Sequence, residues 1–399
     1  MPRKYWLPLL LLAFCIGALL ASDWLVVFSA ALFFFYLTAW VWKKYALIGV
    51  HYTRKFHFHR LFPGESTQVR LTIENRKWLP LSWLRISDNW PEPVGPAIKN
   101  SEIRSSPLID NDTLVSEFSL LPNEQVVRKH ELTFQKRGVY TVGPTNLEAG
   151  DYFGMFATQA ELPARTRLTV YPQLIPLQSL KLSTDDPFGD RSANRRLFED
   201  PNAPMGVRSY HPEDEFRRIH WGATARTGSL QVKVYQPVSA RVMMVCLNVV
   251  TTEKPWLGLQ KNLLEYLISA TATLCYQGIQ EGFSVGLLSN GCLTQADQPF
   301  RILPGRTTEQ LALMLESLAS VTPYHTLPFE EYLSRSLPGL PYGASLVLVT
   351  GIVSPVLIET LIRLRRYRLN TLLFSFEKNH PGDIPGVRVI HLPFEEVHA

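Results

Sequence analysis

Two long apolar runs within residues 1–44 constrain the fold of this chain more than any other feature. Residues 5–21 and 24–42 carry almost no charge and are separated only by Ser22 and Asp23. As helices they would be roughly 26 to 29 Å long at 1.5 Å per residue, close to the roughly 30 Å hydrocarbon core of a bilayer. The sequence therefore predicts a two-helix transmembrane hairpin over residues 1–44.

The charges beside these runs predict how the hairpin is oriented. Arg3 and Lys4 precede the first run and Lys43 and Lys44 follow the second, whereas the turn carries only an aspartate. Because basic residues collect on the cytoplasmic side of membrane proteins, we expect both ends and the soluble domains in the cytoplasm. Residues 5–21 could instead be a cleaved signal peptide, but no polar mature start follows them.

After the hairpin the pattern changes to short segments that alternate between apolar and polar residues. Alternation with a period of two runs through "KFHFHRLF", "TQVRLTIEN", "LVSEFSLL" and "QVVRKHELTFQ", and Pro and Gly punctuate the segments. This pattern is typical of short antiparallel strands. We expect a β-sandwich-like domain over residues 45–172.

The last part of the chain, residues 239–399, alternates between strand and helix patterns. "ARVMMVCLNVV", "FSVGLLSN", "SLVLVTG" and "NTLLFSF" are apolar strand-length runs, and long helical patterns separate them. Such alternation predicts an α/β domain with a parallel sheet covered on both faces. Neither GxGxxG nor GxxxxGK[ST] occurs, so a nucleotide-binding domain is disfavoured.

Residues 173–238 are expected to form a linker and a dense polar box, "VRSYHPEDEFRRIHWGATARTGSLQVK", in a chain that is only 19% charged. Pro212 and the acids after it resemble a helix start, and Arg226 followed by Thr-Gly resembles a helix end. We therefore predict one helix over residues 212–226. In that helix Asp214 and Arg218 share a face, and Arg217 or Arg208 are the alternative partners of Asp214.

The box has the composition of a structural polar network that fixes the helix to the adjoining sheet, or of a docking surface for a protein partner. Arginine and tryptophan often dominate protein interfaces. The nearby nucleophiles and bases match no nucleophile elbow or catalytic triad, so we expect no enzyme activity, with an enzyme or anionic-ligand binder as the alternative. The site residues we single out are Arg208, Tyr210, Asp214, Arg217, Arg218, Trp221 and Arg226.

Composition excludes several other functions. The net charge of +5 is modest, and no zinc motif or Gly-rich cradle accompanies it, so nucleic acid is not an expected partner. The four cysteines have no CxxC or metal-ligand spacing, which predicts reduced thiols and no bound metal. We expect no cofactor.

Several motifs together resemble one known family. Three motifs follow one another along the chain: "KRGVYTVGP", "GDYFGMF" and "TVYP". The box then contains, in this order, arginine-x-tyrosine, an aspartate, a tryptophan and alanine-arginine. This arrangement resembles domain-of-unknown-function family 58. Glu213 stands where the family usually has glycine, so a turn with positive φ is in question there.

The resemblance implies a fold, a partner and a role. The C-terminal domain would be similar to a von Willebrand factor type A domain, whose aspartate-x-serine-x-serine loop often holds a divalent ion. Here Asn248, Val250 and Thr252 occupy those positions, so a metal is not expected. Family members are typically associated with a MoxR-type AAA+ ATPase. The expected protein is a non-enzymatic scaffold in a bacterial inner membrane that docks this ATPase and other membrane or envelope proteins.

Overall fold

The computed structural model describes residues 23–90, 108–110, 113–151, 157–182, 198–212, 214–238, 242–252, 258–336, 344–364 and 369–394. The chain divides into two compact units, Met1–Tyr171 and Pro172–Ala399. Each unit has its own sheets, and the division into four segments expected from the sequence stays a prediction.

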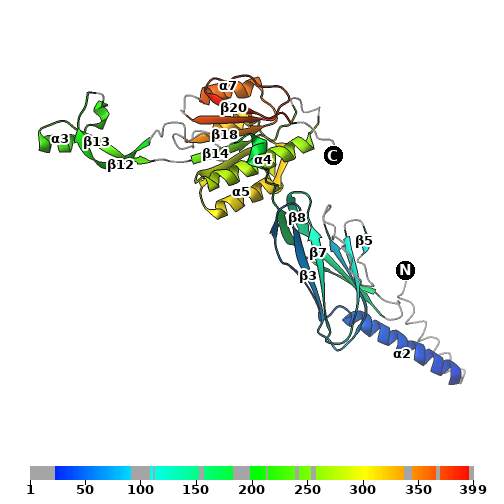
Figure 1. Cartoon of the computed structure of the whole chain (residues 1–399). Coiled ribbons are helices and arrows are strands. Elements are labelled where there is room, and N and C mark those ends of the chain that lie inside the picture. Colours follow the sequence, from blue (N-terminus) through cyan, green and yellow to red (C-terminus); the bar gives the residue numbers. More distant parts are fainter. Residues whose placement is uncertain are drawn as a thin grey trace. The chain divides into compact units, whose positions relative to one another are not determined.

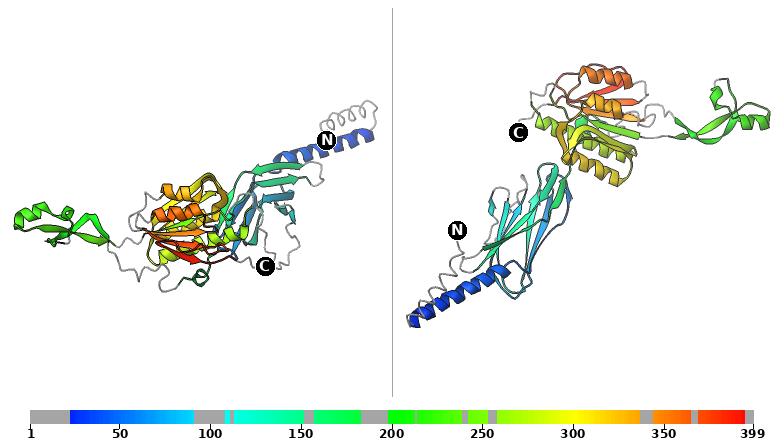
Figure 2. Two further views of the ribbon diagram at one scale, coloured as in Figure 1. Left: turned by 90° about the horizontal axis from the view of Figure 1, so that it is seen from above. Right: turned by 180° about the vertical axis from the view of Figure 1, so that it is seen from behind.

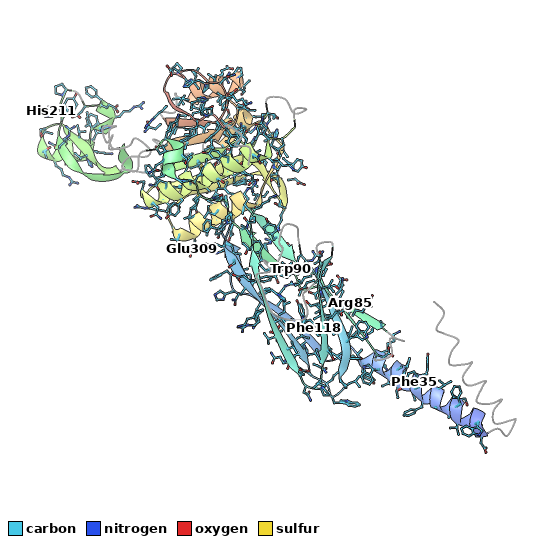
Figure 3. The ribbon with its side chains drawn as sticks, turned by 45° about the vertical axis from the view of Figure 1, so that its right-hand side comes forward. Phe35, Arg85, Trp90, Phe118, His211 and Glu309 are labelled. Atoms are coloured by element: carbon cyan, nitrogen blue, oxygen red, sulfur yellow. The ribbon has the colours of Figure 1, made fainter. Side chains whose placement is uncertain are left out.

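Helix α2 (Asp23–Tyr45) is the apolar helix that the second run predicts. By length and composition its Val26–Tyr45 segment can cross a membrane. Many of its apolar side chains are exposed, among them Trp24 at 87% and Phe34 at 67%. Figure 3 shows α2 with its side chains, and Phe35 is labelled there. The first apolar run lies outside the described residues, so the described part of the chain has one candidate span where the sequence predicts a hairpin.

The carboxyl end of α2 is attached by Lys77 to the β-rich part of the first unit, which we call the sandwich after the architecture that the sequence predicts. The Nζ of Lys77 donates to the carbonyl oxygen of Tyr45 at 2.8 Å and also to that of Ala46. Burial lowers the pKa of Lys77 to about 8. Ala46 is completely buried in a core cluster of the sandwich, so the helix continues directly into the packed domain.

The strands of the first unit form three small sheets. Two of them are antiparallel, and in the third β2 (Arg60–Leu61) lies parallel to its neighbour. In strand order the first sheet is β1 (Val50–Phe56), β3 (Ser66–Asn75) and β7 (Gln125–Thr133). The second is β10 (Ala157–Leu162), β9 (Thr145–Gly150), β4 (Leu81–Asn89), β6 (Thr113–Leu120) and β5 (Leu108–Asp110), and the third is β2, β11 (Thr166–Val170) and β8 (Gly138–Val142).

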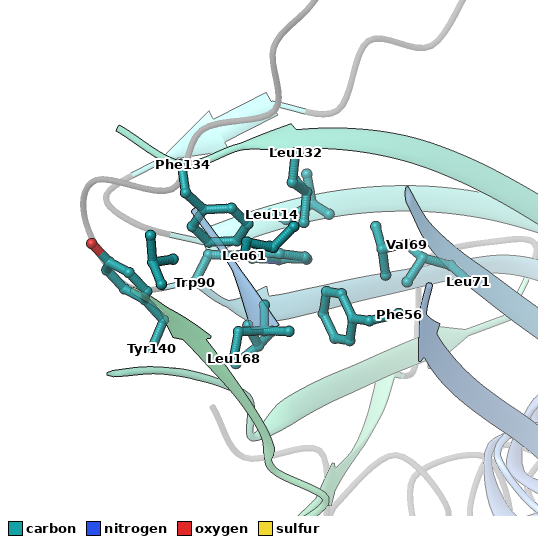
Figure 4. Close-up of a cluster of buried hydrophobic side chains, with 12 residues drawn as sticks. Phe56, Leu61, Val69, Leu71, Trp90, Leu114, Leu132, Phe134, Tyr140 and Leu168 are labelled. Atoms are coloured by element: carbon teal, nitrogen blue, oxygen red, sulfur yellow. The ribbon is translucent and has the colours of Figure 1, made fainter. Parts of the chain in front are cut away.

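Alternating side chains fill the interior between these sheets. In β3 the residues Val69, Leu71 and Ile73 are buried and alternate with more exposed polar neighbours. Figure 4 shows one core cluster, in which Phe56 of β1 and Leu168 of β11 lie among side chains from several strands. Burial of this apolar surface, at about 25 cal/mol per Å², drives the folding of the unit. The expected β-sandwich-like architecture is thus a β-rich unit with two buried clusters.

A charged network lies inside the sandwich. Arg54 NH1 is 3.0 Å from Asp88 Oδ1, and the two side chains are only 4% and 1% exposed. The hydroxyl of Tyr52 donates to Asp88 Oδ2 at 2.5 Å, and that of Thr145 donates to Oδ1. Arg54 also donates to the carbonyl of Val142 at 2.8 Å. Burial raises the pKa of Tyr52, and the Asp88 charge raises it further.

Gly143, in the "KRGVYTVGP" motif, lies beside this network. Its φ is +99°, a conformation that side chains with a Cβ rarely adopt. A Cβ built there would be 2.5 Å from the carbonyl oxygen of Ala164 and 3.1 Å from a guanidinium nitrogen of Arg54. The glycine therefore permits a close approach of chain segments next to the buried arginine.

The second unit contains a mixed sheet in place of the fully parallel sheet expected. Its strand order is β16-β15-β14-β18-β19-β20, and β17 also pairs with β15. Only Thr294 and Gln295 separate β15 from β16, and so short a connection can join only antiparallel strands. The parallel strands are β14 (Val242–Leu247), β15 (Ser284–Leu293), β18 (Ser345–Thr350), β19 (Asn370–Ser375) and β20 (Val387–His391), and the antiparallel ones are β16 (Ala296–Gly305) and β17 (Val321–His325).

Helices cover both faces of this sheet, as expected. Met243 of β14 faces α4 (Lys261–Gln280), since a Cβ on Gly278 of that helix would be 2.0 Å from the Met243 Cε. The next residue, Met244, clusters instead with Leu333 and Leu361 of the helices on the other face. The helices that follow α4 are α5 (Thr308–Ser320), α6 (Phe329–Ser336) and α7 (Pro355–Leu364). Figures 1 and 2 show the strands between α7 on one side and α4 and α5 on the other.

The three described cysteines, Cys246, Cys275 and Cys292, are free and buried in this unit, and Cys15 lies outside the described residues. Burial raises the pKa of the Cys246 and Cys275 thiols above the ordinary value. These two are therefore core residues of low reactivity.

A two-stranded hairpin precedes the α/β sheet in the chain. Strands β12 (Phe198–Ser209) and β13 (Gln231–Val238) pair antiparallel, and the connection between them holds the 3₁₀ helix η3 (Phe216–Arg218) and the helix α3 (Trp221–Thr227). We call residues 198–238, which comprise these four elements and the segments between them, the arm. The arm contains all seven box residues.

The single helix predicted over residues 212–226 is wrong. Ile219 forms a β-bridge with Val232, which requires extended backbone at that point. The helix begins only after His220, whose ring nitrogen accepts from the amide of Ala223 at 3.0 Å. It ends at Gly228, which has a φ of +68°. Strand pairing therefore overrides helix propensity in the middle of the box.

Candidate docking surface and strand-end loop

Asp214 is held by Arg208, one of the alternative partners that the sequence allows. NH1 and NH2 of Arg208 donate to the two carboxylate oxygens of Asp214 at 2.7 and 2.5 Å. The amide of His211 also donates to Asp214 Oδ2, at 2.9 Å. These bonds, the Arg208 bond first, lower the pKa of Asp214 to about 2. The predicted same-face pair of Asp214 with Arg218 does not form.

The other three arginines of the box do not pair with Asp214. Arg218 lies 4.0 Å from the carboxylate of Glu215, at the limit of an ion pair. Arg217 and Arg226 are exposed, and no residue in the described part of the chain pairs with either. Glu213, whose backbone the family resemblance questions, lies outside the described residues.

The arm also exposes large aromatic side chains. Phe216 is 73% exposed and Trp221 is 68% exposed. The ring of Tyr210 lies 5.8 Å from that of Phe216. Trp221 would lie inside the helix predicted over residues 212–226, but it is the first residue of α3. A hydrated surface with two exposed aromatic rings and two unpaired arginines has the composition of a protein-binding hot spot.

The connection that carries these side chains is fixed to β13. The amide of His220 donates to the carbonyl of Gln231 at 2.8 Å, and the amide of Gln231 donates to the Thr224 hydroxyl at 3.0 Å. Ile219 and Val232 are buried, at 4% and 1% exposure. The arm thus has a small core that positions α3, although a two-stranded hairpin alone is only marginally stable in water.

The strand-end loop after β14 contains the residues that occupy the expected metal positions. Asn248 is 4% exposed and donates to the Thr350 hydroxyl at 3.0 Å. Val250 offers no side-chain oxygen, and the hydroxyl of Thr252 donates to the carbonyl of Gly258 at 2.8 Å. Among the described residues, no group of three or more histidine, cysteine, aspartate or glutamate side chains could hold a metal ion. This donor set does not suit a hard divalent cation, which prefers several carboxylate oxygens.

The fold and site define a class of protein: a candidate membrane helix, a β-rich unit, and an α/β sheet preceded by an exposed basic and aromatic arm. Residues 206–357, which span most of the arm and the sheet as far as α7, match a family described as "Protein of unknown function DUF58". The resemblance of the box to family 58 is therefore confirmed over that stretch.

Individual relatives match only part of the chain. "Uncharacterized protein YeaD" of Bacillus subtilis is 21% identical over 261 residues, which are 64% of this chain and 60% of that protein. The chain thus spans less than two thirds of the length of the Bacillus subtilis protein. Among solved structures, a CARDB domain from Pyrococcus furiosus is 15% identical with a TM-score of 0.20, covering 30% of this chain and 86% of that one. A Salmonella α-2-macroglobulin mutant is 12% identical with a TM-score of 0.21, covering 33% and 9%.

Proposed function

We propose that this protein is a non-enzymatic, membrane-anchored docking protein whose arm binds a protein partner. The observation that carries the proposal is the exposure of Phe216 and Trp221 beside the unpaired Arg217 and Arg226. Buried aromatic anchors surrounded by arginines supply most of the binding energy in many interfaces. The partner implied by the family resemblance is a MoxR-type AAA+ ATPase, which would act with this protein in assembling a membrane or envelope complex.

The anchor completes the proposal. The apolar helix α2 would hold the protein in a bacterial inner membrane, and a second span over residues 5–21 would make it multi-pass. The basic residues beside the runs would keep the soluble units on the cytoplasmic side, where an ATPase is available. The α/β unit, proposed to be of von Willebrand factor type A-like architecture, would then present the arm to the ATPase or to other membrane proteins.

Co-purification of the detergent-solubilised full chain with a co-expressed MoxR-type ATPase tests this function. Trp221→Ala should weaken capture roughly 30-fold, since truncation of an interface tryptophan commonly costs about 2 kcal/mol. Trp78→Ala is the matched control, because Trp78 is 81% exposed but belongs to the sandwich unit. Equal capture by both variants would contradict the docking role of the arm.

The alternative is a membrane-surface enzyme or a binder of anionic ligands that uses the same arginines. Arg217 and Arg226 favour it, because no described residue neutralises either of them. Titration with inorganic phosphate and pyrophosphate separates the two functions. Binding that is lost in Arg226→Glu and kept in Trp221→Ala would support the anion binder, and no binding would support the docking protein.

A further inference from the structure

A pocket of about 890 Å³ opens where strands β14 and β18 end. These two strands are parallel neighbours, and the helices that follow them, α4 and α7, pack on opposite faces of the sheet. Ligands of open α/β sheets bind in the crevice that such a divergence creates at the carboxyl ends of the strands. The described lining comes from the loops after β14 and β18, from β17 and from the start of α6.

Two backbone donors on the β14 side of the pocket, the amides of Val249 and Val250, are already occupied. The side-chain oxygen of Asn248 accepts from the amide of Val250 at 3.1 Å. The side-chain oxygen of Asn290 accepts from the amide of Val249 at 3.0 Å, and its Nδ2 donates to Asn248 at 3.2 Å. All of these side-chain groups are buried and neutral. The amides of Val249 and Val250 are therefore satisfied within the protein and are not offered to an anionic ligand.

On the β18 side of the pocket, two backbone amides likewise donate to side chains of the protein. The amide of Ile352 donates to the hydroxyl of Thr350 at 3.2 Å, and the amide of Val353 donates to Glu377 Oε2 at 3.2 Å. Four backbone donors, two on each side of the crevice, are thus taken by side chains of the protein. A ligand with negative charge would approach the carboxylate of Glu330, and His325 is the only basic side chain among the described residues that line the pocket.

Glu330 is the one carboxylate among the described residues that line the pocket. It lies half-buried in the first turn of α6, and its Oε1 accepts from the hydroxyl of Ser354. That hydroxyl in turn accepts from the amide of Leu357 at 3.1 Å, so the carboxylate is held in position. No described group donates to Oε2 of Glu330. An oriented carboxylate with a free oxygen is suited to a cation that donates hydrogen bonds.

The remaining walls are mostly apolar. Val249, Phe329 and Val353 line the pocket together with Leu259, which is 39% exposed, and Tyr324, which is 77% exposed. An aromatic ring and aliphatic side chains around one carboxylate fit a cationic side chain whose stem and neighbours are apolar. We propose that this pocket binds an arginine- or lysine-bearing peptide segment of a partner protein, with apolar residues beside the cation and with no metal ion.

Fluorescence anisotropy of the detergent-solubilised full chain tests the proposal with a labelled Leu-Ala-Arg-Ala-Leu peptide in the presence of EDTA. The wild-type protein should bind this peptide and should bind the same peptide with glutamate in place of arginine at least 10-fold more weakly. Glu330→Gln should lower the affinity for the arginine peptide at least 10-fold. Glu331→Gln is the matched control, because Glu331 lies next to it on α6 but pairs with Arg335.

Leu259→Lys provides a second variant that leaves the carboxylate untouched. It places an ammonium at the rim of the pocket, and it should weaken binding of the arginine peptide by repulsion. Binding that requires a divalent ion, equal binding of both peptides, no binding, or wild-type affinity in Glu330→Gln would each overturn the proposal. The Trp221→Ala variant should bind the peptide as the wild-type protein does. A loss of peptide binding by the pocket can therefore be told apart from a loss of partner docking by the arm.

Discussion

The sandwich and the arm each contain an arginine paired with an aspartate, but the two pairs differ in burial. In the sandwich, Arg54 and Asp88 are 4% and 1% exposed, and two hydroxyl groups complete the aspartate shell. In the arm, Arg208 and Asp214 are 48% and 13% exposed. The same type of ion pair is therefore shielded from water in the sandwich and exposed to water in the arm.

This difference separates two uses of charge. A buried pair is costly to desolvate and costly to break, because removal of one partner leaves an uncompensated charge in the interior. An exposed pair contributes little to global stability but can fix a local geometry. We conclude that Asp88 maintains the packing of its unit, whereas Asp214 fixes the turn from which the exposed arm residues project.

The largest effect is expected from breaking the buried pair. Asp88→Ala should destabilise the sandwich by about 3–5 kcal/mol, since Arg54 would remain buried without a counter-charge. Denaturant unfolding followed by tryptophan fluorescence measures this change. Glu117→Ala is the control, because Glu117 pairs with Arg85 on the surface and should cost only about 0–1 kcal/mol. Equal losses in the two variants would remove the distinction between buried and exposed pairs.

The backbone beside Arg54 should be the next most sensitive point. Gly143→Ala combines a positive φ with a 2.5 Å clash and should cost about 1–3 kcal/mol or more. Gly64→Ala is matched, because Gly64 has a φ of +86° but no atom within 4 Å of the position that a Cβ would take. It should cost only about 1 kcal/mol, the penalty of the conformation alone. A larger loss at Gly64 would show that crowding next to Arg54 is unimportant.

Breaking the exposed pair should act locally. Arg208→Ala should leave the unfolding midpoint of the sandwich unchanged and accelerate hydrogen exchange at the amide of His211, which donates to Asp214. Arg208→Lys keeps the charge but loses the two-pronged geometry, so its exchange rate should lie between those of wild type and Arg208→Ala. Unchanged exchange in both variants would mean that the pair does not hold the turn.

The smallest effect is the pH dependence of the arm. Asp214 has a pKa of about 2, lowered from 3.8, so the folded arm binds its proton more weakly than the unfolded chain does. The stabilisation it supplies is therefore complete above about pH 4 and is lost as the pH falls through about 2. Carbon-13 NMR of the side-chain carboxyl measures this pKa. In Arg208→Ala the pKa of Asp214 should rise toward 3.8. An unchanged pKa would mean that the hydrogen bond from the His211 amide alone lowers it.

Much of the fold could be predicted from periodicity. The apolar strands of the second unit and the helical patterns between them occur where expected, because a buried core requires long apolar segments. The edge strand β16 was missed, since "ADQPFRILPG" mixes polar residues and two prolines and buries only Phe300. Its pairing depends on the tight turn at Thr294 and Gln295, which a pattern of apolar residues does not report.

The site was harder to predict because its geometry depends on contacts between distant residues. The sequence correctly offered Arg208 as a partner of Asp214, but the helix start inferred at Pro212 placed Arg218 beside it. Aspartate also closes local turns, and here Asp214 accepts from the amide of His211. The β-bridge of Ile219 with Val232 then keeps the helix from starting before Trp221. The pocket carboxylate, Glu330, was missed because no motif marks it.

The attachment of α2 to the sandwich has a mechanical consequence. Lys77 binds the last carbonyls of the helix, and Ala46 is completely buried, so no slack linker separates the two. If α2 spans a bilayer as proposed, a change in its tilt would rotate the sandwich as a rigid lever. The thickness of the bilayer would then determine the tilt of α2 and, with it, the angle between the sandwich and the membrane normal. A thinner bilayer would increase both angles.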